Sequence, residues 1–229
     1  MEQNARYQRN QSSISPEEQA MLMASTVAVI GCGGLGGYMA EELARLGIGH
    51  LILIDGDRFD ETNLNRQLFA TEDNIGEWKV EAARRRLQGV NSKTDVQCIQ
   101  DWFHELGGET MLGRADLVLD ALDSLSARLE LERVCNRKGI PLVFAGVAGW
   151  FGLLGVSRPG EFLISKLFGK NQSVEESTLG NLAFTPAVVA SLAVAEGVKI
   201  LTGKQGVLNK SWLQINLLAM EFETIKILD

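Results

Sequence analysis

Four glycines after an apolar run form the first pattern in this chain that could bind phosphate. Residues 27–30 read Val-Ala-Val-Ile, and Gly31, Gly33 and Gly36 follow at the spacing G-x-G-x-x-G, with a further glycine at Gly34. A glycine turn between a strand and a helix lets phosphate oxygens approach backbone N–H groups at the helix N-terminus. We therefore expect the backbone of these four glycines to bind a nucleotide.

Two aspartates follow the next apolar run and extend this candidate site. Asp55 comes directly after residues 50–54, and an acid at that position is expected to accept hydrogen bonds from ribose hydroxyls. Asp57 is a weaker candidate for the nucleotide site, because it could merely shape the turn. Glycines with one downstream acid also suit a dinucleotide, so an NAD-dependent oxidoreductase is one alternative.

Cations and amides further along favour a triphosphate over a nicotinamide. Arg66 can bind phosphate through two N–H groups at once, and Lys79 adds a compact positive charge. The amides of Asn63 and Gln67 can orient ribose or phosphates. A nicotinamide enzyme has no need for such a set, whereas a triphosphate does, so the pattern predicts ATP as the ligand.

Two more carboxylates, Asp120 and Asp123, stand at the end of a short apolar run at residues 117–120. A magnesium ion that is shared with phosphates usually takes few protein carboxylates, so we expect Asp123 to hold one. Its alternative role is to cap the helix that begins near Ser124. Asp120 is expected to be structural or to face the ribose.

The three cysteines, Cys32, Cys98 and Cys135, are widely separated and form no C-x-x-C pair. This spacing argues against a disulfide framework and against a zinc site made of thiolates. We therefore expect no zinc site and a location in the reducing cytoplasm, with all three thiols in structural positions.

Charge and hydropathy exclude two classes of partner. The formal net charge is -7 and the chain has no lysine-rich run, which argues against nucleic acid as the main partner. Pro186, Glu196 and Lys199 interrupt the longest apolar tract, residues 182–201. We therefore expect neither export nor a membrane span.

The elements that must position these residues alternate between apolar runs and helical patterns. Continuous apolar strands separated by helices predict a doubly wound, Rossmann-like α/β fold with a mostly parallel sheet, whose ligand lies at the carboxyl ends of the strands. Ser15 and Pro16 indicate the start of an earlier helix. We predict strands at residues 27–30, 50–54, 95–99, 117–120 and 141–144, and helices at 35–46, 77–87 and 124–138.

The pattern changes beyond residue 150. Residues 150–156 and 214–228 are expected to add antiparallel strands, and residues 168–181 a loop. A helix from Thr185 to about residue 201 is apolar nearly all round, which predicts burial against the sheet or against another subunit.

The whole chain resembles the ThiF/MoeB/HesA group of ubiquitin-activating-enzyme-like adenylyltransferases. Each motif alone is weak, but five in this order are specific. They are residues 6–9 (Arg-Tyr-Gln-Arg), Gly31 to Gly36 with Asp55, residues 63–67 (Asn-Leu-Asn-Arg-Gln), 76–79 (Gly-Glu-Trp-Lys) and 119–123 (Leu-Asp-Ala-Leu-Asp). The resemblance implies a single domain over residues 1–229, with an N-terminal arm and helix at 1–24, a nucleotide-binding half at 25–150, and a carrier-binding and dimerisation half at 151–229.

The resemblance also implies a reaction. The C-terminal glycine of a small ubiquitin-fold sulfur carrier, ending in Gly-Gly, would attack the α-phosphate of ATP and give an acyl adenylate and pyrophosphate, in thiamine or molybdopterin biosynthesis. Arg66, Lys79 and Asp123 would then be catalytic. Arg9 would be catalytic too, because this position reaches the triphosphate of the neighbouring subunit in a homodimer.

The sequence departs from the family in two places. Many relatives bind zinc through two C-x-x-C pairs, which this chain lacks, and some carry a cysteine in the loop before the late helix. Here that loop, residues 173–181, offers only Ser177 and Thr178, which are poor nucleophiles without a base, so we expect adenylation without covalent transfer. Two alternatives stay open: a half-active or non-catalytic subunit of a heterodimeric enzyme, and a tRNA-modifying dehydratase.

Two adjacent aromatic residues, Trp150 and Phe151, follow the predicted parallel strands. They could line a channel for the tail of the carrier. Large aromatic side chains bury much apolar surface, however, and we expect them in the core.

Overall fold

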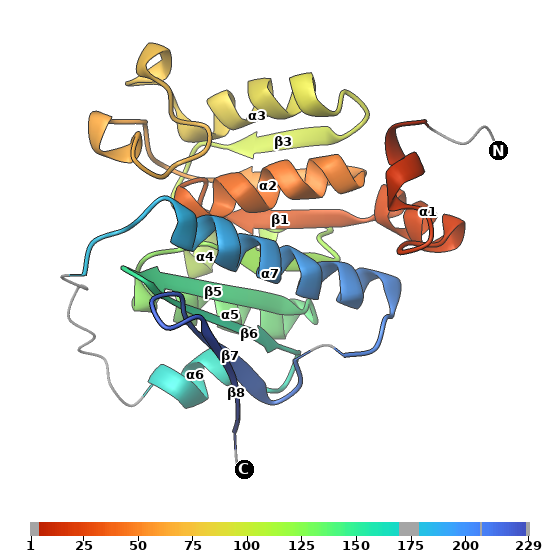
Figure 1. Ribbon diagram of the computed structural model, residues 1–229, viewed down its shortest axis with the longest axis vertical. Coiled ribbons are helices and arrows are strands. Elements are labelled where there is room, and N and C mark those ends of the chain that lie inside the picture. Colours follow the sequence, from red (N-terminus) through yellow and green to blue (C-terminus); the bar gives the residue numbers. More distant parts are fainter. Residues whose placement is uncertain (1–4, 170–178, 207, 228–229) are drawn as a thin grey trace.

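A single mixed sheet of eight strands organises the protein in a computed structural model that describes residues 5–169, 179–206 and 208–227 (Figure 1). The strand order is β3-β2-β1-β4-β5-β6-β7-β8, parallel from β3 to β5 and antiparallel from β5 to β8. The strands are β1 (Thr26–Ile30), β2 (His50–Ile54), β3 (Asp95–Ile99), β4 (Leu117–Asp120), β5 (Leu142–Ala148), β6 (Phe151–Ser157), β7 (Ser211–Asn216) and β8 (Glu221–Lys226). The predicted α/β class and antiparallel extension are confirmed.

Helices cover both faces of this sheet, which makes the domain doubly wound. One apolar cluster joins the sheet to α1, α2, α3 and α7, and the other joins it to α4, α5 and α6. Figure 1 shows α2 and α7 side by side over the central strands. The helices are α1 (Pro16–Ala24), α2 (Gly34–Leu46), α3 (Lys79–Val90), α4 (Glu105–Met111), α5 (Leu125–Lys138), α6 (Leu163–Phe168) and α7 (Phe184–Thr202), with 3-10 helices η1 (Ala5–Asn10), η2 (Glu61–Asn63) and η3 (Glu72–Asn74).

Local signals placed most of these elements within two residues. Ser15 caps α1 with a reciprocal bond to Glu18, and Pro16 occupies its first position. The short helices α4 and α6 were not predicted. The sequence of α4 contains Gly107 and Gly108, which disfavour a helix, and the ring nitrogen of His104 caps it by accepting the N–H of Gly107.

The long apolar helix α7 packs against α2, β5 and β6, as its pattern predicted. Among the described residues it is also the one helix whose length and composition would allow it to cross a membrane, a test that a buried core helix passes as well.

The backbone brings the ends of four parallel strands to one edge. Beyond the strands the hydrogen bonds continue, from the N–H of Gly31 to Ile54 O at 2.8 Å and from the N–H of Ala121 to Ile30 O at 2.9 Å. The N–H of Asp55 donates to Ile99 O at 3.2 Å in the same way. The glycine turn, Asp55 and the residues after β4 therefore share the carboxyl edge of the sheet, where doubly wound folds bind their ligands.

Candidate nucleotide site

Two of the four glycines are required by the protein's own packing. Gly31 has φ +93°, and a Cβ there would lie 2.8 Å from Ala121 O. At Gly36 a Cβ would lie 1.8 Å from Gly31 O, so this residue allows α2 to start directly against the turn. A side chain at Gly31 would push the turn away from Ala121, and a side chain at Gly36 would push α2 away from the turn.

The other two glycines leave room instead. A Cβ at Gly33 would lie 3.6 Å from Gln67 Nε2, and a Cβ at Gly34 would lie 3.6 Å from Pro186, both ordinary contacts. Gly33 is the N-cap of α2 and supplies no side chain to cap it. The helix therefore offers N–H groups at an uncovered N-terminus, a common site for phosphate.

Asp55 ties the end of β2 to this glycine turn. Its Oδ2 accepts the N–H of Cys32 at 2.6 Å and its Oδ1 accepts the N–H of Asp57 at 2.7 Å. Burial raises the pKa of Asp55, although these hydrogen bonds and the charge of Lys79 act to lower it. Each carboxylate oxygen keeps capacity for a further hydrogen bond, so the ribose role assigned from the sequence stays a prediction.

Lys79 is a buried cation that points back to the strand end. Its side chain is 8% exposed, and its Nζ lies 2.9 Å from Asp57 Oδ2. Its backbone N–H donates to Asp57 O at 3.0 Å, which fixes the first turn of α3 beside the turn after β2. An ammonium group has three donors, so this ion pair leaves two that could bind phosphate oxygens.

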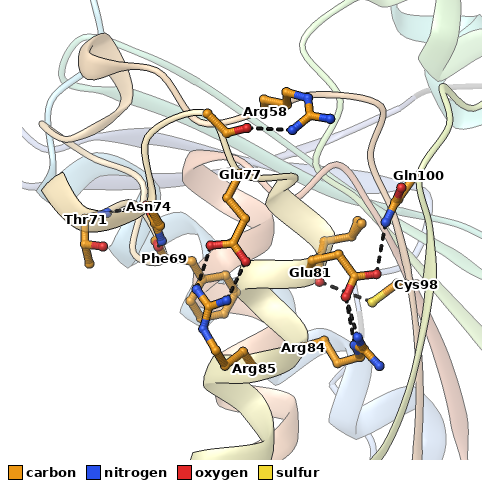
Figure 2. Close-up of polar contacts among 12 residues, drawn as sticks. Arg58, Phe69, Thr71, Asn74, Glu77, Glu81, Arg84, Arg85, Cys98 and Gln100 are labelled. Carbon is orange, nitrogen blue, oxygen red and sulfur yellow. Dashed lines mark hydrogen bonds and ion pairs between the residues drawn. The ribbon is translucent and has the colours of Figure 1, made fainter.

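Polar contacts attach α3 and the residues before it to neighbouring loops (Figure 2). Glu77 and Arg85 form a two-bond ion pair, with N–O distances of 2.5 and 2.6 Å. Arg58 donates to Gly76 O at 2.7 Å, and Gln100, which follows β3, donates to Glu81 at 3.0 Å. The helix is thus attached to the loops after both β2 and β3.

The loop after β2 brings the predicted amides and guanidinium to the glycine turn. Asp60 and Asn63 form a capping box at the start of the 3-10 helix η2. The backbone carbonyl of the buried Asn63 accepts the backbone N–H groups of Arg66 and Gln67. Within the protein alone Asn63 therefore shapes this loop. Its predicted contact with ribose or phosphate stays a prediction.

Gln67 and Arg66 lie near consecutive glycines of the turn. Gln67 is 7% exposed and packs near Gly33, and its buried Oε1 has no hydrogen-bond partner. Arg66 packs near Gly34 and uses Nη1 to donate to Thr62 O and Asn65 Oδ1, at 3.0 and 2.8 Å. An unpaired buried amide oxygen is costly, so a hydrogen-bond donor that reached Gln67 Oε1 would stabilise this arrangement.

After β4, the two predicted carboxylates have different surroundings. Asp120 is fully buried, and burial raises its pKa, with Arg128 at 3.4 Å acting against that shift. Asp123 is exposed on the loop, while Ser124 caps α5 by accepting the N–H of Ala127. The alternative of Asp123 as that helix cap is therefore wrong, and its carboxylate is accessible to a metal ion.

Arg128 is a residue that the sequence analysis missed. Its guanidinium pairs with Asp120, donates to Leu122 O and lies beside Gly146, whose Cβ would be 3.8 Å from Nη2. Its one signal was its position one helical turn after Ser124, on the first turn of α5. It partly neutralises the buried carboxylate at the end of β4.

Arg9 does not lie at this edge of the sheet. It is exposed on η1, which Tyr7 anchors against Gly47, the residue that ends α2. The thirteen residues of α2 span about 20 Å, and the glycine turn is at the opposite end. Within one chain Arg9 is therefore far from the site that its predicted role requires.

Burial weakens each of the three cysteines as a nucleophile. It raises the pKa of Cys98 to about 11 and that of Cys135 to about 12, and the pKa of Cys32 is raised as well. The thiolate is the reactive form, so these environments favour the structural role expected for all three. Ser177 and Thr178 lie outside the described residues. Among the described residues, no group of three or more His, Cys, Asp or Glu side chains could hold a metal ion.

The expectation that Trp150 and Phe151 belong to the core is wrong, because each is 40% exposed. The Trp150 ring instead contacts Phe184 at the start of α7, with 4.8 Å between ring centroids. Trp150 lies in the tight turn between β5 and β6, and Phe151 is the first residue of β6. Trp150 and Phe184 therefore form an exposed aromatic pair at the start of α7.

A model of the ThiF family matches residues 7–229. The chain belongs to the ThiF family. It is 32% identical over 197 residues to the sulfur carrier protein ThiS adenylyltransferase of Escherichia coli, covering 83% of this chain and 77% of that protein. It is 36% identical over 138 residues to the tRNA threonylcarbamoyladenosine dehydratase of Bacillus subtilis, covering 60% of this chain and 54% of that protein.

A crystal structure of E. coli MccB with ATP has the same fold as this ThiF-family protein. The TM-score is 0.81 at 27% sequence identity, over 98% of this chain and 72% of that one. The family match and the adenylyltransferase among its relatives show that the chain is an adenylyltransferase.

Proposed function

We propose that this protein uses ATP to adenylate the C-terminal glycine carboxylate of a ubiquitin-fold sulfur carrier, in thiamine or molybdopterin biosynthesis. The observation that carries the proposal is the meeting of Lys79, Asp55 and the glycine turn at one edge of the sheet. Asp55 accepts the backbone N–H of Cys32 in the turn and the backbone N–H of Asp57. Lys79 forms an ion pair with the side chain of Asp57. The solved MccB structure with ATP, which shares this fold, supports ATP as the nucleotide.

The residues present suit the charge changes of this reaction. A carboxylate oxygen forms a bond to the α-phosphorus, the bond to the β-phosphate breaks, and pyrophosphate leaves with the electron pair. No general base is needed, because the attacking carboxylate is already deprotonated at neutral pH. Lys79 and Arg66 would neutralise the negative charge that gathers on the phosphates, and the uncapped start of α2 would add N–H donors.

The exposed carboxylate of Asp123 fits a magnesium ion, since Mg²⁺ prefers oxygen ligands and takes few from the protein when phosphates are present. Asp123 would hold the ion, whose charge would stabilise the phosphate oxygens. The buried Asp120, already paired with Arg128, is suited to support the loop on which Asp123 lies.

The site would be completed by a second copy of the chain, in a cytoplasmic homodimer. Arg9 is exposed at the end of α2 that lies farthest from its own glycine turn. It could therefore contribute to catalysis only in the site of a partner. This arrangement would make each site depend on both subunits.

Pyrophosphate release measured with a panel of purified ubiquitin-fold carriers tests the proposed substrate. One carrier should release pyrophosphate with ATP and magnesium, and the same carrier with its final glycine changed to alanine should not. A slim Gly-Gly tail is needed to lie beside the nucleotide. Release without any carrier, or with none of the panel, would contradict this substrate.

The dehydratase relative favours a second candidate, in which the activated carboxylate belongs to a modified tRNA nucleoside. The net charge of -7 is unfavourable for binding RNA. Adding modified tRNA to the same assay separates the two candidates, because tRNA-dependent pyrophosphate release would favour the dehydratase.

A further inference from the structure

Trp102 is a large aromatic side chain that the proposed reaction leaves without a role. It lies three residues after β3 and is 59% exposed, whereas the next residue, Phe103, is buried at 7%. The Trp102 N–H donates to Asp101 Oδ1 at 2.8 Å, which fixes the turn between β3 and Phe103. The exposed indole is therefore held by buried and hydrogen-bonded neighbours rather than at a free loop tip.

One face of the indole lies against the backbone of Gly56. A Cβ at Gly56 would be 2.9 Å from three ring atoms of Trp102, so the ring crosses directly over this α-carbon. The φ of Gly56 is not among the positive values in the described chain, so the backbone itself would accept another residue there. The missing side chain is needed to make room for the ring.

This contact places the indole next to the predicted ribose acid. Gly56 follows Asp55 directly, and the N–H of Asp57 bonds to Asp55 Oδ1 around it. The glycosidic bond joins the nucleobase directly to its ribose. A ribose held by Asp55 would therefore place its base close to Gly56. Because Trp102 contacts Gly56 and is 59% exposed, its indole is within reach of such a base.

We propose that the indole of Trp102, seated on Gly56, is the platform on which the nucleobase of the bound nucleotide stacks. An aromatic ring stacks on any base without hydrogen bonds, and such contacts contribute substantially to nucleotide affinity. The inference rests on the proposed use of ATP. It adds that the pair formed by positions 56 and 102 determines how tightly the base is held.

Binding of ATP and of inorganic tripolyphosphate, measured by calorimetry on the full chain, tests the proposal. Trp102→Ala should weaken ATP binding by about 10- to 100-fold and leave tripolyphosphate binding unchanged, because only ATP carries a base. Trp102→Phe should restore most of the affinity. Gly56→Ala should weaken ATP binding too, since its Cβ would displace the ring.

Phe222→Ala is the matched control, because it removes an aromatic side chain that is 49% exposed on the distant strand β8. It should change neither affinity. Unchanged ATP binding in Trp102→Ala would overturn the stacking role, and equal weakening of both ligands would show that the ring is structural. A wild-type chain that binds neither ligand would instead refute the proposed function itself.

Discussion

The carboxylate of Asp55 accepts the backbone N–H of Cys32, with 2.6 Å between Oδ2 and the nitrogen. Asp55 directly follows β2 and Cys32 lies inside the glycine turn, so the predicted ribose acid also fixes the shape of the predicted phosphate loop. The two halves of the nucleotide site therefore cannot move independently. A change at Asp55 should affect both.

Asp55→Ala is expected to weaken ATP binding by about 10- to 100-fold, because a hydrogen bond to a charged group contributes about 1.5–3 kcal/mol. Calorimetry with ATP and magnesium measures the effect. Asp95→Ala, which removes an exposed carboxylate from β3 at the opposite edge of the sheet, is the control and should bind normally. Normal binding by Asp55→Ala would exclude Asp55 from the site.

Acid should weaken ATP binding earlier than an ordinary aspartate would predict. Burial raises the pKa of Asp55 above 3.8, so its ionised form is lost at a higher pH in the folded chain. The folded chain therefore holds the Asp55 proton more tightly than the unfolded chain does. Between pH 3.8 and the raised pKa, the contribution of Asp55 to the free energy of unfolding falls as the pH rises. When the pH is lowered in steps, the ATP affinity of the wild type should begin to fall while the pH is still above 3.8. The Asp55→Ala variant should not show this fall.

Lys79→Gln is expected to reduce carrier-dependent pyrophosphate release by about 100- to 1,000-fold, the usual cost of removing a group that stabilises transition-state charge. The substitution also leaves the Asp57 carboxylate without its cation, next to the phosphates. Lys93→Gln, at an exposed turn after α3, should keep full activity. Carrier binding should be unchanged in both, so a loss of carrier binding would point to misfolding instead.

Asp123→Asn is expected to raise the magnesium concentration needed for half-maximal activity by about tenfold or more, because the amide is a weaker ligand for a hard cation. Titration of magnesium at fixed ATP measures this shift. Asp73→Asn removes another exposed carboxylate, on η3, and should leave the titration unchanged. An unaltered magnesium requirement in Asp123→Asn would remove the metal role.

Mixing two inactive variants tests the shared site. Arg9→Ala and Asp123→Ala should each be inactive, but a re-equilibrated mixture should regain about one quarter of the wild-type activity, because half of the dimers then carry one intact site. Mixing Arg9→Ala with the variant that carries both substitutions should restore no activity, because neither subunit then supplies Arg9. Full activity of Arg9→Ala alone would show that the arginine plays no part in catalysis.

The cysteines should be unreactive at neutral pH and dispensable for adenylation. With a pKa of about 11 for Cys98 and about 12 for Cys135, the thiolate fraction is very small, and alkylation by iodoacetamide should accelerate as the pH rises. Cys98→Ser and Cys135→Ser should keep normal pyrophosphate release. A thioester between the carrier and either cysteine, detected by mass spectrometry, would contradict adenylation without covalent transfer.

The amino-acid sequence by itself determined the nucleotide-binding half of the fold. Apolar runs, separated by helical patterns, marked four of the five parallel strands, because strands buried on both faces are continuously apolar; the edge strand β3 contains polar residues as well. The roles of the spaced glycines and of Asp55 could be predicted from the sequence for a similar reason. Their roles depend on backbone geometry that is local to a strand and the turn after it.

Only the tertiary structure decided how distant residues share that site. It paired Lys79 with Asp57, placed Gln67 beside Gly33, seated Trp102 on Gly56 and exposed Trp150, which the sequence had suggested was buried. These contacts depend on the relative positions of loops from different strands and on which helix covers each strand. Neither is encoded by a local periodicity, because the contacting residues belong to segments whose spacing in the chain does not fix their distance in space.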